Sequence, residues 1–187
     1  MKAYFNLDLK QSHPLYSSWQ IGRLIFMLRG INIKDLLLLS SSNIKNGRII
    51  YKRAKTGKIY SIKLIPEMQE IFNTFNANNT LLGILSNSEA KNSDNLVKVI
   101  VQKRKVINSH LKRLGILSKS NEPLSTYVFR YSYANIAKQM GYSKDLIAES
   151  LGHSYGNAVT GIYLEQFDNE LLDEMNKKII RSILKVK

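Results

Sequence analysis

The sequence predicts an α+β fold that is mainly helical, with one small antiparallel sheet packed against a helical core. Apolar residues recur with helical spacing along most of the chain. The interval 48–64 differs, because two runs rich in β-branched and aromatic residues flank a short turn there. With 187 residues and 44% apolar content, the chain is long enough for one core and short for two. We therefore expect a single domain over residues 1–187.

The first helices are expected where the apolar spacing is clearest. A helix is predicted from Trp19 to Leu28, and Gly30 is placed to end it before a second helix at 33–39. Further along, a helix follows Pro66, and a longer one is predicted over 96–114.

The second half of the chain carries recognisable helix boundaries. Ser125 is placed to cap a helix that ends at Gly141, and Ser143 is placed to cap the next one. Gly152 has the position of a C′ glycine, so His153 is expected just past that helix end. A last helix is predicted from an apolar stripe of Leu172, Met175, Ile179, Ile183 and Val186. This stripe must be covered by the same chain or by a neighbouring copy.

The sheet is expected to be a basic β-hairpin. Its strands are predicted at Arg48–Arg53 and Lys58–Leu64, and residues 54–57 form the turn. Lys55 then lies near the tip of the hairpin.

Positive charge is the strongest feature of the composition. The formal net charge is +14, and the acid-free segments 43–66 and 95–121 each contain seven basic residues. Segregated cations favour a surface that binds a polyanion, although a solvated lysine-rich surface that binds nothing is the alternative. The residues expected to contact that polyanion are Lys52, Arg53, Lys58, Lys103, Arg104, Lys105, Lys112 and Arg113.

Several classes of protein are excluded by composition. The chain has no cysteine, which excludes disulfides and Cys-ligated zinc, and its three histidines are too widely separated to favour a metal site. No metal is expected. An apolar run long enough for a membrane span or a signal peptide is also missing from the sequence, so we expect a cytoplasmic protein.

Four residues could together form a phosphoryl-transfer site: Tyr163, His153, Arg130 and Lys55. A tyrosine hydroxyl with a pKa of about 10 is a weak nucleophile at neutral pH, so it needs a positive field and a proton acceptor. Arginine suits that field, because it binds phosphate oxygens bidentately and stays charged at any relevant pH.

The order of these motifs resembles that in the catalytic domain of tyrosine recombinases of the phage-integrase type, above all the integrases of conjugative transposons. The resemblance is carried by the run 26–36, the Lys55-Thr56-Gly57 turn, the block 127–134, Leu151-Gly152-His153 and Tyr163. It covers nearly the whole chain. The family's usual N-terminal DNA-binding domain is missing, so we expect the chain to be the catalytic domain of a longer integrase.

The resemblance implies a mechanism. Tyr163 would attack a DNA phosphodiester to give a 3′-phosphotyrosyl link and a free 5′-hydroxyl, while Arg130 holds the nonbridging oxygens. Lys55 would protonate the leaving oxygen, and His153 would bind the phosphate and assist proton transfer. No cofactor is implied. The implied partners are double-stranded DNA and further copies of the chain, and the implied location is the nucleoid. The free chain would be a monomer, and on DNA it would form a tetramer through the C-terminal helix.

The sequence departs from the family pattern at three places. Asn32 occupies the slot of the family's first arginine, and the nearest replacement is Arg29, which could instead cap its helix or pair with Asp35. Tyr127 replaces a histidine, and it is expected either to bind phosphate or only to pack. Tyr155 is a rival nucleophile to Tyr163, which lies in the better-matched segment.

These departures leave two other functions open. One is a DNA-binding module that keeps the basic face and has lost catalysis. The other is relaxation of DNA in the manner of a type IB topoisomerase, which uses the same chemistry without exchange of partners.

Overall fold

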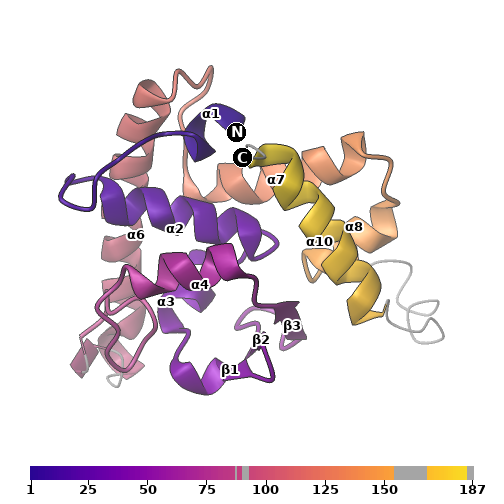
Figure 1. Ribbon diagram of the computed structural model, residues 1–187. Helices are drawn as coiled ribbons and strands as arrows, with labels where there is room; N and C mark the ends of the chain where they lie inside the picture. The colour runs from indigo at the N-terminus through magenta and orange to yellow at the C-terminus, as the bar shows by residue number, and fades with distance from the viewer. Residues whose placement is uncertain (87, 90–92, 154–167, 185–187) are drawn as a thin grey trace.

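A computed structural model describes residues 1–86, 88–89, 93–153 and 168–184 of the protein (Figure 1). The helices are α1 (Lys2–Phe5), α2 (Tyr16–Met27), α3 (Ile33–Leu38), α4 (Pro66–Asn73), α6 (Ser93–Leu117), α7 (Thr126–Gln139), α8 (Lys144–Ser150) and α10 (Asn169–Ile183), with a 3-10 turn η1 (Ser41–Asn43). The antiparallel sheet has the order β1 (Ile44–Lys45), β2 (Arg48–Lys52) and β3 (Ile59–Lys63). The predicted α+β class, mainly helical, is confirmed.

Helix α2 forms the centre of the core. It packs against α4, α6 and α7 (Figure 1), and the side chains from Leu24 to Leu28 are fully buried. The helix ends at Met27, earlier than the sequence predicts, because Arg29 as well as Gly30 adopts a left-handed backbone, with φ values of 55° and 67°. This turn brings Gly30 against α7, where a Cβ atom on Gly30 would lie 2.7 Å from Cγ of Arg130.

The basic hairpin is confirmed, and both strands are slightly shorter than predicted. Tyr51 pairs with Tyr60 across β2 and β3, and their rings stack with centroids 5.0 Å apart. The turn is closed by the amide of Arg53, which donates to the carbonyl of Lys58 at 2.9 Å, and by the amide of Gly57, which donates to the carbonyl of Arg53 at 2.8 Å. The hairpin tip is therefore ordered by its own backbone.

Helix α8 begins and ends as its sequence predicts. The Ser143 hydroxyl accepts a hydrogen bond from the amide of Leu146, and Gly152 has a φ of 65°. The amides of Gly152 and His153 donate to the carbonyls of Glu149 and Ala148, which is the Schellman pattern. This fixed helix end places His153 immediately after the C′ glycine.

Helix α10 packs on its own chain, against α7 and β3 (Figure 1). Its apolar stripe is buried there, although Val186 lies outside the described residues. The Asn176 amide nitrogen adds a hydrogen bond of 3.0 Å to the carbonyl of Met27. The surface that covers the stripe in this structure is thus supplied in cis. No helix in the described part of the chain is long and apolar enough to cross a bilayer.

Candidate active site

Arg130, on α7, joins two segments that are far from it in sequence. Its Nη1 atom donates to the carbonyl of Gly30 at 2.6 Å, and its Nη2 atom donates to the carbonyl of Leu151 at 2.5 Å. Nη2 also lies 3.0 Å from Nε2 of His153. Because the guanidinium is planar and rigid, two backbone carbonyls are enough to fix its orientation before any ligand binds.

The surroundings of His153 favour a neutral imidazole. Its pKa lies below the ordinary value, because partial burial disfavours the charged ring and because Arg130, Arg53 and Lys55 place positive charge near it. An arginine N–H can only donate, so Nε2 of His153 accepts from Arg130 and the ring proton resides on Nδ1. The lowered pKa favours the neutral form of the ring, and a neutral imidazole can accept a proton.

Lys55 belongs to the same group of charges. Its side chain is exposed near the hairpin tip, and its ammonium contributes to the lowered pKa of His153. Beside it lies a small hollow of about 210 Å³ lined by Asn32, Lys34, Asp35, Arg53, Ala54 and Lys55. The structure thus brings Arg130 and His153 into contact, and Lys55 lies close enough for its charge to lower the pKa of His153.

Arg53 and Lys58 have partners within the protein. Arg53 is only 8% exposed, and its Nη1 atom donates to the carbonyl of Gly152 at 2.8 Å. Lys58 forms an ion pair with Glu149, with Nζ and Oε2 2.5 Å apart. Arg53 is therefore buried and bonded inside the protein, whereas the charge pattern placed it among exposed residues expected to contact DNA. The alternation in strand β2 indicated this burial, because Arg53 continues the inward-facing positions Ile49 and Tyr51 at a spacing of two.

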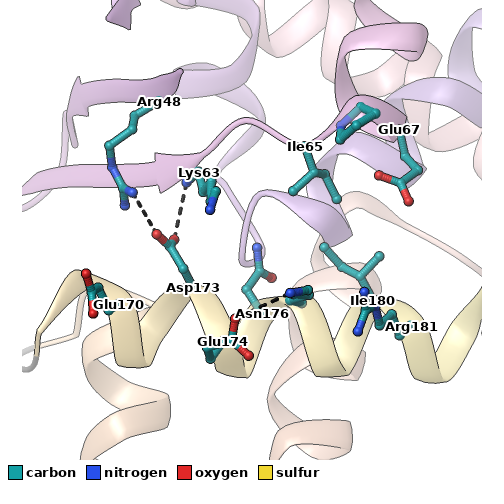
Figure 2. Close-up of a pocket in the computed structure, with 12 residues that line it drawn as sticks. Arg48, Lys63, Ile65, Glu67, Glu170, Asp173, Glu174, Asn176, Ile180 and Arg181 are labelled. Carbon is teal, nitrogen blue, oxygen red and sulfur yellow. Dashed lines mark hydrogen bonds and ion pairs between the residues drawn. The ribbon is translucent and has the colours of Figure 1, made fainter. Parts of the chain in front are cut away.

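Arg29 lies outside the group around Arg130. It is 2% exposed, and its Nη2 atom is 2.5 Å from Oδ1 of Asp173 on α10. Asp173 also accepts from Arg48 at 2.7 Å and from the amide of Lys63 at 3.2 Å (Figure 2). Burial lowers the pKa of Arg29 more than any nearby charge raises it. The alternative partner Asp35 instead accepts from the amide of Ala54 at 3.2 Å.

The position of Asn32 has a structural explanation. Its side-chain oxygen accepts from the amide of Lys34 at 2.9 Å, which caps α3. The position at which the resemblance implied an arginine therefore holds a helix cap, and Arg29, three residues earlier, is bound to an acid. Arg53 is the second arginine whose charge acts on His153.

The remaining predicted residues are mostly exposed. Tyr127 is 71% exposed on α7, which shows that it does not pack in the core. Lys103 lies 3.8 Å from Glu89, and the other predicted DNA contacts are exposed: Lys52, Arg104, Lys105, Lys112 and Arg113. Tyr163 and its rival Tyr155 lie outside the described residues.

No family model, curated protein or solved structure matches this chain. Within residues 1–86, 88–89, 93–153 and 168–184, no group of three or more His, Cys, Asp or Glu side chains is arranged to hold a metal ion.

Proposed function

We propose that this domain breaks and rejoins DNA strands through a 3′-phosphotyrosyl intermediate, as the catalytic domain of an integrase-type tyrosine recombinase. The observation that carries the proposal is the hydrogen-bonded pair of Arg130 and His153, on which the charge of Lys55 also acts. These residues come from α7, the end of α8 and the hairpin, and their combined charge suits a phosphate with two negatively charged oxygens in its transition state.

Each residue has a defined part in the proposed step. The hydroxyl oxygen of Tyr163 attacks phosphorus, and the bond between phosphorus and the 5′-oxygen breaks. The phenol proton passes to Nε2 of His153, which is freed when the phosphate replaces it as the acceptor of the Arg130 N–H. Arg130 binds the nonbridging oxygens, and the ammonium of Lys55 gives its proton to the leaving 5′-oxygen. Attack by a 5′-hydroxyl from another strand reverses the step. The phosphotyrosyl ester conserves the bond energy, so the reaction needs no nucleotide cofactor.

The proposed substrate is double-stranded DNA. The net charge of +14 and the exposed basic side chains on α6 support binding to a polyanion. Assembly into a tetramer on DNA, with α10 exchanged between copies, is part of the same proposal. In the monomer, α10 would first have to leave the surface that it covers in cis.

One observation favours a second function, a DNA-binding module without catalysis. Arg29, the nearest replacement for the family's first arginine, is buried and bound to Asp173. A phosphate site with one arginine fewer would stabilise the transition state less well.

Covalent trapping tests the proposal. The protein is incubated with nicked duplexes of randomised sequence, and the reaction is stopped with detergent. The products are then examined for DNA that migrates with the protein. We expect a covalent complex that Tyr163→Phe abolishes and that Tyr155→Phe leaves. Arg130→Ala should lower its rate of formation by about 10²-fold or more, because one preorganised donor is lost. Arg181→Ala, in an exposed arginine on α10, is the matched control.

The other outcomes of this experiment identify the alternatives. Duplex binding without a covalent complex would support the DNA-binding module and contradict the proposed enzyme. Relaxation of supercoiled plasmid by the monomer, with no exchange of strands, would instead support topoisomerase-like activity.

A further inference from the structure

The hairpin that carries Lys55 is attached to α8 on both sides of that residue. On one side, Arg53 donates to the carbonyl of Gly152 at 2.8 Å, and on the other, Lys58 pairs with Glu149 at 2.5 Å. The Lys58 attachment reaches Glu149 in the last turn of α8, and the Arg53 attachment reaches Gly152, which follows the helix and directly precedes His153. The lysine and the histidine of the site are thus connected through short protein contacts.

A third attachment holds the hairpin from α3. The amide of Ala54, next to Lys55, donates to the carboxylate of Asp35 at 3.2 Å. The turn itself is closed by the two backbone hydrogen bonds between Arg53 and residues 57 and 58. The backbone on either side of Lys55 therefore has little freedom of its own.

Burial indicates that these contacts persist in the folded protein. Glu149 is 7% exposed and Arg53 is 8% exposed. Charged side chains are seldom buried without a partner, because removing one from water is costly. Each of these two groups has a partner across the boundary between the hairpin and the end of α8, so separating the two elements would leave Glu149 without its ion pair and Arg53 without its bond to Gly152.

We propose that Arg53, Lys58 and Glu149 are positioning residues that hold Lys55 at a fixed distance from His153 and Arg130. The inference rests on the proposed function, since it assigns these residues a task in the protonation of the leaving oxygen. A lysine side chain has a flexible four-carbon stem, and an anchored backbone at its base limits the region that the ammonium can reach. The alternative is that Arg53 and Lys58 bind DNA phosphates directly.

Glu149→Gln separates the two roles, because it removes the ion pair and leaves every cation in place. We expect duplex affinity and its salt dependence to stay unchanged. Cleavage should slow by about 10- to 100-fold, the range expected when a catalytic group is misplaced by up to 1 Å. A substrate with a 5′-bridging phosphorothiolate should recover most of this loss, because a thiolate leaves without being protonated.

A charge exchange gives a second comparison. Lys58→Glu alone should slow cleavage, and Lys58→Glu combined with Glu149→Lys should restore the rate to within a few fold, because the pair is reformed with opposite orientation. If Lys58 binds a DNA phosphate, the double variant will remain weak in duplex binding. That result would overturn the inference.

Hydrogen exchange tests the attachment without DNA. Exchange at the amides of Arg53 and Gly57 should accelerate in Glu149→Gln and remain unchanged in the control Glu174→Gln, which alters an exposed carboxylate on α10. Unchanged exchange in Glu149→Gln, or no recovery with the phosphorothiolate, would overturn the positioning role. If the unaltered protein forms no covalent complex, the proposed function is overturned. Hydrogen exchange would still show whether Glu149 anchors the hairpin, but the anchor would then have no catalytic role.

Discussion

At the end of α8, the backbone of Gly152 satisfies two requirements at once. Its φ of 65° lies in the left-handed region, and a Cβ atom there would overlap the hydroxyl oxygen of Tyr60. Only glycine combines this backbone with so close an approach. The contact seats the turn before His153 against the hairpin, so one residue without a side chain sets the separation of two parts of the site.

We predict that Gly152→Ala destabilises the protein more than Gly47→Ala does. Gly47 has a similar φ of 69°, but a Cβ atom added to it would meet no atom of the described residues within 4 Å. Its substitution should therefore cost only backbone strain, about 1–2 kcal/mol. Gly152→Ala should add the cost of steric overlap with Tyr60, about 1–3 kcal/mol more. Urea unfolding measures both, and equal free energies of unfolding would show that the turn relaxes away from Tyr60.

Local chemistry explains which residues can be predicted from the sequence. Ser143 and Gly152 are predictable as helix boundaries because capping depends on a few adjacent residues. The partner of Arg29 could not be predicted, because Asp173 lies 144 residues away and only the packing of α10 brings the two together. The burial of Arg53 was not predicted, because charge in a basic segment says less about exposure than the inward place of the residue in the strand alternation does.

Among the elements, α10 shows what an apolar pattern leaves undetermined. Its stripe predicted a helix, since the spacing is intrinsic to the sequence. The stripe could not identify the surface that covers it, because any apolar face of suitable shape would serve. The short β1 and α1 were missed for another reason, since elements of two and four residues contain too few positions to show a period.

We predict that Asp173→Asn loosens α10 and destabilises the fold. Asp173 compensates the buried guanidinium of Arg29 and also bonds Arg48 and the amide of Lys63, as Figure 2 shows for the last two. Leaving Arg29 without its counter-ion should cost about 2 kcal/mol or more.

The control for Asp173→Asn is the neighbouring acid on the same helix. Glu174 is exposed and pairs with Lys177 one turn away, so Glu174→Gln should change the free energy of unfolding by less than about 0.5 kcal/mol. Chemical denaturation of the two variants gives the comparison. If both lose the same stability, Asp173 contributes no more than a surface charge.

Across the whole molecule, positive and negative charge are distributed differently. The exposed side chains of α6 include a basic group without an acid between residues 95 and 121, whereas α10 carries Glu170, Asp173 and Glu174 together with its lysines. A DNA duplex should be attracted to the acid-free surface of α6 much more than to the mixed surface of α10. A cation adds affinity by neutralising a phosphate and releasing its condensed counterions, and nearby acids repel the phosphate.

The salt dependence of duplex binding should therefore respond to where a charge is removed. Arg104→Gln with Lys105→Gln removes two exposed cations from α6, and Lys177→Gln with Lys178→Gln removes two from α10. Each phosphate contact that is lost should reduce the slope of log affinity against log salt by about 0.9. We expect a reduction of that size for one or both α6 residues and almost none for the α10 pair, measured by fluorescence anisotropy over a range of salt concentrations. Equal reductions in both double variants would mean that only total charge matters, and a slope near zero in the unaltered protein would contradict DNA binding itself.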